Sequence, residues 1–188
     1  MNRLDVKKLN LSDLILLLIG ASEGRVEGRT LVQKLVYFLV HVYKIPLSQK
    51  PHFRAGLYGP YSRDVASELL KLVALDFLAE ETKVTSTGNL VYIYSLTEDG
   101  KKIFEEINAK YREQYSLIKK FMNKIRGEKS EDLIVASKLH YIIEENPRLT
   151  EEPEKIISRA ENYGWEIKPE EIDKGFRILR AIEYDQET

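Results

Sequence analysis

The stretch FRAGLYGPYSRDVASELLKLVALDFLAEE (Phe53–Glu81) places a Tyr-Gly-Pro-Tyr-Ser turn directly before an amphipathic helix. From about Tyr61 onward, apolar residues recur at helical spacing and form one stripe: Val65, Leu69, Leu72, Val73 and Phe77. The other side of this helix is polar and of mixed charge. Two interpretations stay open. The segment is either a plain turn before a core helix, or a helix held at a set angle so that one face touches a partner.

The turn has residues suited to fixing that angle. Gly59 can adopt backbone angles that other residues avoid, or allow close approach. Pro60 fixes φ at the first turn of the helix without losing a hydrogen bond there. Tyr58 and Tyr61 have rings that pack while their hydroxyls stay in water. We therefore interpret Tyr58, Gly59, Pro60, Tyr61 and Ser62 as a helix-positioning turn, and the alternative is a helix entry with no binding role.

Two helices are expected before this stretch. Residues 12–22 are apolar nearly all round, which predicts a buried helix with Ser12 as its N-cap. A polar loop with one short extended piece at Val26 follows. Thr30 and Gln33 then form a capping-box pattern that opens a second helix, and Pro46 stops it.

A β-hairpin and more helices are expected after it. Residues 80–96 hold β-branched and aromatic residues around a Ser-Thr-Gly-Asn turn, which predicts the hairpin. Thr97 caps a long helix that runs to about Arg126. Further helices open at Ser130, at Thr150 and at Pro169.

This order of elements predicts a mainly α fold with a small β-hairpin. It matches a winged helix-turn-helix core in residues 1–105, followed by a helical extension in residues 106–188. Along the long helix from Thr97, residues at near-heptad spacing form a stripe that is either a dimer seam or a surface covered by the last helices. The stripe is Ile103, Ile107, Tyr111, Ile118, Met122 and Ile125.

The segment LVQKLVYFL, followed about twenty residues later by GLYGPYS and a helix, resembles the Panacea-type, SocA-like antitoxin domain. It is more similar still to the small prokaryotic family that includes YwgA. The resemblance covers roughly residues 10–105 and implies a winged-helix-like domain used in regulation or partner binding, with no catalytic residues to transfer. It rests on Gln33, Lys34, Leu35, Tyr37 and Phe38, and on Tyr58, Gly59, Pro60 and Ser62.

The charge is unevenly distributed along the chain. Residues 1–96 carry 12 Lys and Arg against 9 Asp and Glu, a net of +3, and residues 97–188 carry 17 against 21, a net of −4. If the partner is DNA, we expect Arg63, Lys71 and Lys83 to contact phosphates. Asp64 and Glu68 offset the first two, so a solvated face of mixed charge is an equal alternative. A wider basic footprint would add Arg25, Arg29, Lys34 and Arg54.

Enzymatic chemistry is not expected. The chain has no cysteine, which excludes disulfides and thiolate chemistry. His41, His52 and His140 lack metal-ligand spacing, and His41 lies within an apolar helix. Neither a phosphate-binding glycine loop nor a serine elbow is present. We therefore predict no catalytic residue, no metal and no cofactor.

The N-terminal residues allow two interpretations. Arg3, Lys7 and Lys8 before LILLLIGAS resemble a signal peptide, but Ser12 and Asp13 interrupt the pattern, so a buried first helix is favoured. We expect a cytoplasmic protein without a membrane span, and the abundance of Lys, Glu and Ile favours a thermophilic source. The expected function is transcription control by DNA binding, with an antitoxin-type protein-interaction module and a homodimer as further expectations.

Overall fold

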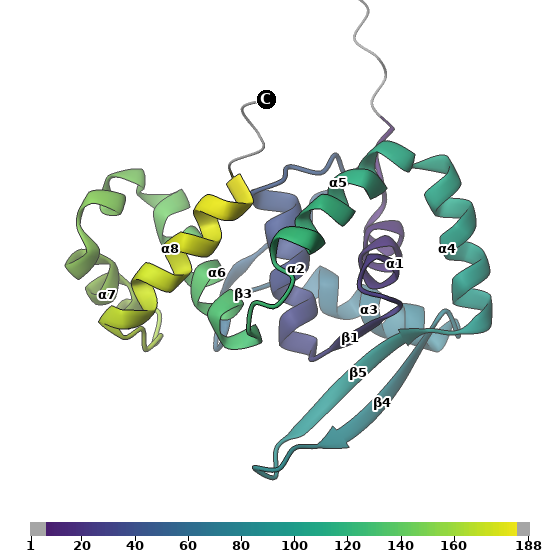
Figure 1. The fold of residues 1–188 in the computed structure, drawn as a ribbon, viewed down its shortest axis with the longest axis horizontal. Helices are drawn as coiled ribbons and strands as arrows, with labels where there is room; N and C mark the ends of the chain where they lie inside the picture. Colours follow the sequence, from purple (N-terminus) through teal and green to yellow (C-terminus); the bar gives the residue numbers. More distant parts are fainter. Residues whose placement is uncertain (1–6, 184–188) are drawn as a thin grey trace, which may run out of the picture.

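The computed structural model describes residues 7–183. Helices dominate, and a three-stranded and a two-stranded antiparallel sheet join them (Figure 1). The helices are α1 (Leu11–Ala21), α2 (Arg29–His41), α3 (Arg63–Ala74), α4 (Glu98–Lys110), α5 (Arg112–Lys124), α6 (Ser130–Glu145), the 3-10 helix η1 (Pro147–Glu151), α7 (Pro153–Asn162) and α8 (Pro169–Glu183). The strands are β1 (Arg25–Glu27), β2 (Arg54–Gly56), β3 (Gly59–Tyr61), β4 (Leu78–Val84) and β5 (Leu90–Leu96).

The predicted hairpin is confirmed. Strands β4 and β5 pair antiparallel from Leu78↔Leu96 to Val84↔Leu90, and the short strand predicted at Val26 joins them as β1, giving the order β1-β5-β4. We call β4 and β5 with their connecting turn the wing, because the pair projects from the helical body (Figure 1). The mainly α class with a small hairpin is thus confirmed, while its assignment to winged helix-turn-helix proteins stays a prediction.

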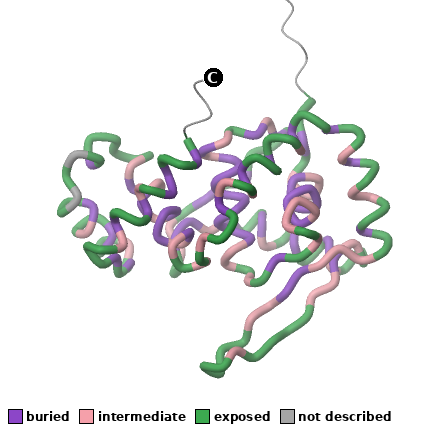
Figure 2. Tube along the Cα trace, viewed as in Figure 1, coloured by how far each residue is buried: buried purple, intermediate pink, exposed green. Residues whose placement is uncertain are grey.

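The core lies around the first two helices. Six consecutive residues of α1, Leu14 to Ile19, are buried, as are Val32 to Val40 of α2. Figure 2 shows the buried segments along these central helices, with exposed residues on the outer helices and toward the tip of the wing. The extension packs against this centre, since α5 contacts α1 and α6 contacts both α2 and β3. Residues from both halves of the chain therefore share one hydrophobic core.

The near-heptad stripe of α4 and α5 belongs to that core. Ile107, Tyr111, Ile118 and Ile125 are buried, and Ile103 and Met122 pack against them. This surface is covered within the chain, so it is not a free seam for a second copy.

Several predicted helix boundaries are wrong. Asn10, not Ser12, caps α1 and accepts a hydrogen bond from the Asp13 N–H. Gly28 precedes α2 with φ +106° and no side-chain cap, so Thr30 lies inside the helix. The side chain of Gln33 bonds to the backbone of Ser62 and not to the helix terminus, so no capping box forms. Pro46 lies beyond the end of α2 at His41.

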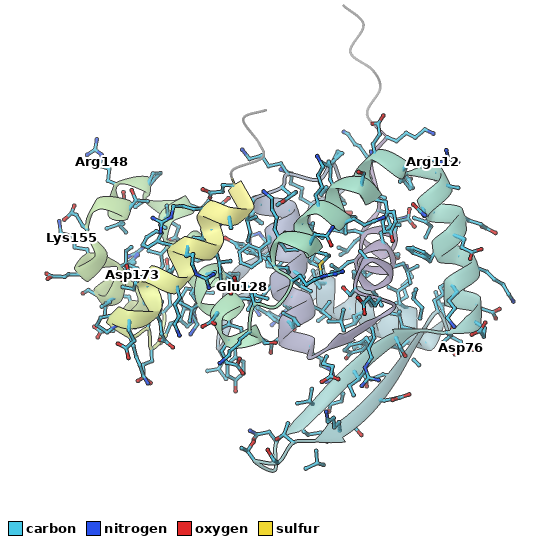
Figure 3. The ribbon with its side chains drawn as sticks, in the orientation of Figure 1. Asp76, Arg112, Glu128, Arg148, Lys155 and Asp173 are labelled. Carbon is cyan, nitrogen blue, oxygen red and sulfur yellow. The ribbon has the colours of Figure 1, made fainter. Side chains whose placement is uncertain are left out.

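Two further boundaries differ in the extension. The long helix predicted from Thr97 is two helices, because Tyr111 leaves the helical conformation with φ −124° and ψ 45°. Arg112, at this corner, is labelled in Figure 3. The Thr97 cap itself is confirmed, since its hydroxyl accepts from the Gly100 N–H. Thr150 lies in η1, and α7 begins at Pro153, where proline suits the first turn.

An ion pair joins the last helix to the body. Arg177 of α8 donates to both carboxylate oxygens of Glu128, each at 3.0 Å, and Figure 3 labels Glu128 beside α8. No helix in residues 7–183 has both the length and the apolar content needed to cross a bilayer.

Candidate interaction groove

Four residues join α2 to the turn before α3, and we call them the clamp: Gln33, Lys34, Pro60 and Ser62. The Gln33 amide donates from Nε2 to the Ser62 carbonyl at 2.9 Å and accepts the Ser62 N–H at Oε1, also at 2.9 Å. Lys34 donates from Nζ to the Pro60 carbonyl at 2.7 Å. All four residues are buried, so these bonds are shielded from water. The clamp fixes the position of the turn relative to α2.

The turn itself differs from the prediction in one respect. Pro60 lies in β3 and pairs with Ala55, so it does not open the helix. Ser62 is the N-cap, and its hydroxyl accepts from the Val65 N–H at 3.4 Å. The proline is tolerated because β3 belongs to a two-stranded sheet, where a missing donor does not interrupt a longer ladder.

Gly59 is needed for two reasons. Its φ of +97° is unfavourable for other residues. A Cβ there would also lie 3.1 Å from Cγ of Lys138 and 3.3 Å from Oγ of Ser137, both on α6. The backbone of the β2–β3 hairpin therefore lies directly against α6.

The C-terminal part of the chain secures the same hairpin. Trp165, which is 2% exposed, donates from Nε1 to the carbonyl of Gly56 at 2.7 Å. Its ring packs with those of Tyr141 and Tyr163, at centroid distances of 5.7 and 4.8 Å. Residues 138–165 thus hold the hairpin from one side and the clamp holds it from another.

A groove of about 520 Å³ opens between this hairpin, α2, α3 and β5. Buried side chains of Val32, Val65 and Leu69 contribute its apolar lining. Leu57 and Tyr58 from the hairpin and Leu70 from α3 also line it, and these are 75%, 60% and 57% exposed. The structure therefore combines an apolar groove with apolar side chains left in water.

The charged side chains lining the groove are Arg29 and Lys34, and neither is a free cation. Arg29 donates to both carboxylate oxygens of Glu80 and to the Tyr94 hydroxyl, and it stacks over the Tyr92 ring. Burial, with a smaller contribution from the charge of Lys138, lowers the pKa of Lys34 to about 7. The groove is thus close to neutral.

The predicted basic footprint is not assembled into one free surface. Besides Arg29 and Lys34, Arg25 pairs with Glu27 and Lys71 pairs with Glu68. Among residues 7–183, no ion-pair partner is found for the exposed side chains of Arg54, Arg63 and Lys83.

His41 and His140 lie near each other in the fold, joined through Tyr37 and Glu144, although they are far apart in the sequence. His41 and Glu144 form a 2.9 Å hydrogen bond, and the Tyr37 hydroxyl bonds to both Glu144 and Nδ1 of His140. Burial lowers the pKa of His140 to about 4, against the opposing effect of Glu144. His140 is therefore neutral near pH 7. Within the described part of the chain, no group of acidic or histidine side chains is suited to holding a metal.

Sequence reasoning identified the residues of the clamp but not their bonds. Gln33 was assigned to a helix cap, and Lys34 to a phosphate contact, because polar residues are usually exposed. Leu57 and Leu70 were missed as groove residues. Leu57 lies in a turn and Leu70 lies beside the predicted apolar stripe, so helical spacing alone does not indicate that they line a groove.

Comparison with protein-family models finds no model that matches this chain, and comparison with curated proteins finds no match.

Proposed function

We propose that the protein is a regulatory protein-interaction module whose groove binds an apolar segment of a partner protein. One observation carries the proposal: three of the seven exposed large apolar side chains in residues 7–183 line this single groove. Water-exposed apolar clusters beside a concavity are typical of binding surfaces. The proposed segment inserts two or three apolar side chains into the groove.

The electrostatics of the groove support an uncharged segment. The Arg29 guanidinium is already matched by Glu80, and burial lowers the pKa of Lys34, which disfavours its charged form. A charged side chain entering this apolar volume would be desolvated without a free counter-charge. The role agrees with that of an antitoxin-type module, the alternative to DNA binding expected from the sequence.

A displayed library of random peptides tests the proposal with the full chain as bait. The double variant Leu57→Glu and Leu70→Glu places charges at the groove without touching a buried residue. Leu117→Glu on α5 is the matched control, since Leu117 is also exposed but does not line the groove. We expect enriched peptides rich in apolar residues that bind the wild type and the control equally. Their affinity for the double variant should fall at least about tenfold. Enrichment of nothing, or of peptides that bind the double variant equally well, would contradict the proposal.

A second candidate function is DNA binding in transcription control. It is favoured by the projecting wing, which carries Lys83, and by Arg63 at the first position of α3, where the helix terminus also favours anions. Fluorescence anisotropy with duplex DNA at several salt concentrations tests it. If these residues contact phosphates, replacing Arg63, Lys71 and Lys83 with glutamine should flatten the salt dependence by up to about three counterions.

A further inference from the structure

The outer edge of the wing carries unpaired backbone groups. Strand β4 pairs only with β5, and Glu81 to Val84 are exposed. Within residues 7–183, no other strand pairs with this edge. A free strand edge is a template for another strand, so natural proteins either protect it or use it.

The hydrogen bonds at both ends of β4 show which residues face outward. The Thr97 N–H donates to Phe77 O and the Thr85 N–H donates to Asn89 O, so residues 77 and 85 bond toward β5. Because bonding direction alternates along an antiparallel strand, residues 79, 81 and 83 also bond toward β5. The N–H and C=O groups of Glu80, Thr82 and Val84 therefore point outward.

This alternation restricts how two copies of β4 pair about a two-fold axis. Centring the pair on Thr82 lets Thr82 bond to its own equivalent, while Glu80 bonds to Val84 of the other copy, and all of these groups face outward. The same register places Glu81 directly opposite Lys83 of the other copy, twice in the dimer.

Pairing the two copies in a neighbouring register would place like charges opposite each other. Centring on Glu81 opposes two glutamates, and centring on Lys83 opposes two lysines, in non-hydrogen-bonded positions where Cα atoms approach to about 4.5 Å. Like charges directly opposite one another destabilise a sheet. Glu81 and Lys83 have no ion-pair partner among the described residues, so both are available for the Thr82-centred register.

Apolar residues at the ends of the wing favour the same arrangement. Val84 and Leu90 are exposed at its tip, and Leu75 is exposed where α3 leads into its base. In an antiparallel pair, the tip of one wing lies toward the base of the other. The pairing would thus cover apolar side chains that the monomer leaves in water.

We propose that the protein forms a two-fold symmetric homodimer through the outer edges of β4, centred on Thr82, with Glu81 and Lys83 paired across the interface. The wing is then an assembly surface separate from the groove. In this assembly Lys83 is a dimer contact and is not free to bind phosphate.

Charge exchange tests the register. In sedimentation equilibrium, Glu81→Lys alone and Lys83→Glu alone should each weaken dimerisation about tenfold or more, because each opposes like charges twice. The double variant E81K/K83E restores opposite charges and should return to within about threefold of the wild-type Kd. All of these positions are exposed, and circular dichroism verifies the fold. A wild type that stays monomeric up to about 1 mM, or a double variant that is not rescued, would overturn the proposal.

Cysteine cross-linking gives a second test, because the natural chain has no cysteine. At the dimer centre, a Thr82→Cys pair has Cα atoms about 5.5 Å apart, within disulfide range. Mild oxidation should convert this variant to a covalent dimer faster than Ser86→Cys, which lies in the exposed turn away from the axis. Equal rates for the two variants would overturn the proposed register.

Discussion

The clamp and the wing use the same kinds of side chain for opposite purposes. In the clamp, a glutamine and a lysine are buried, and each bonds to backbone groups more than 25 residues away. In the wing, the side chains of Glu81 and Lys83 lie in water and have no ion-pair partner within the described chain. The comparison shows that burial, rather than residue type, decides whether a polar side chain holds the fold together or remains available to a partner.

Among changes to the clamp and the wing, removing the Gln33 amide should cause the largest loss of stability. Gln33→Ala leaves the buried Ser62 N–H without a partner, and the Ser62 C=O keeps only its bond from the Ala66 N–H. We therefore expect a loss of about 2–4 kcal/mol in the free energy of unfolding. Gln49→Ala, at an exposed loop position, is the matched control and should change little. Urea denaturation measures both, and equal stabilities would show that water replaces the amide.

Glycine substitutions separate backbone strain from crowding in the two regions. Gly59 and Gly88 both have positive φ, but an added Cβ meets side chains only at Gly59. We expect Gly88→Ala in the wing to cost about 1 kcal/mol, and Gly59→Ala to cost about 2–3 kcal/mol. Thermal melts of the two variants compare them directly. A Gly59→Ala loss no greater than that of Gly88→Ala would mean that Lys138 and Ser137 move aside.

The clamp should also make stability depend on pH. The pKa of Lys34 is about 7 in the folded chain against an ordinary 10.5, so between these values only the unfolded chain holds the proton. Stability therefore rises with pH in this window, by about 2 kcal/mol from pH 7 to 9. Urea unfolding across that range should show the rise in wild type and in Lys83→Met, and its absence in Lys34→Met. The same rise in all three proteins would assign it to another group.

The smallest effect is expected for the stability of the wing itself. Lys83→Gln removes an exposed charge that has no partner within the described chain, so the free energy of unfolding of the monomer should change by less than about 0.5 kcal/mol. Urea unfolding in dilute solution, where the monomer prevails, measures it. A larger loss would place Lys83 in an interaction within the chain.

Patterns that depend on local chemistry were predictable from the sequence. The β4–β5 hairpin, the Thr97 cap and the first turn of α8 at Pro169 follow from neighbouring residues alone. The clamp was not predictable in this way. Gln33 satisfies a capping pattern locally, but its side chain bonds to the buried backbone of Ser62 instead, 29 residues away. Tyr111 likewise fits a continuous helical stripe, yet the chain turns there and α5 packs against α1.

The groove was only partly predictable for the same reason. The turn at Tyr58–Ser62 was identified from its residue types, and the positive φ of Gly59 fits that interpretation. The exposure of Leu57 and Leu70 depends on how α3 and the hairpin sit on α2, which is a tertiary property.

Trp165 gives the protein an optical reporter of its own. It is the single tryptophan in the chain, and its indole N–H donates to the carbonyl of Gly56, directly before the turn formed by Leu57 and Tyr58. Any occupant that shifts this hairpin must alter the surroundings of the indole. The fluorescence emission of Trp165 should therefore report on occupancy of the groove, without a dye or an engineered probe. The reporter lies far from α2 in the sequence but beside the groove in the fold.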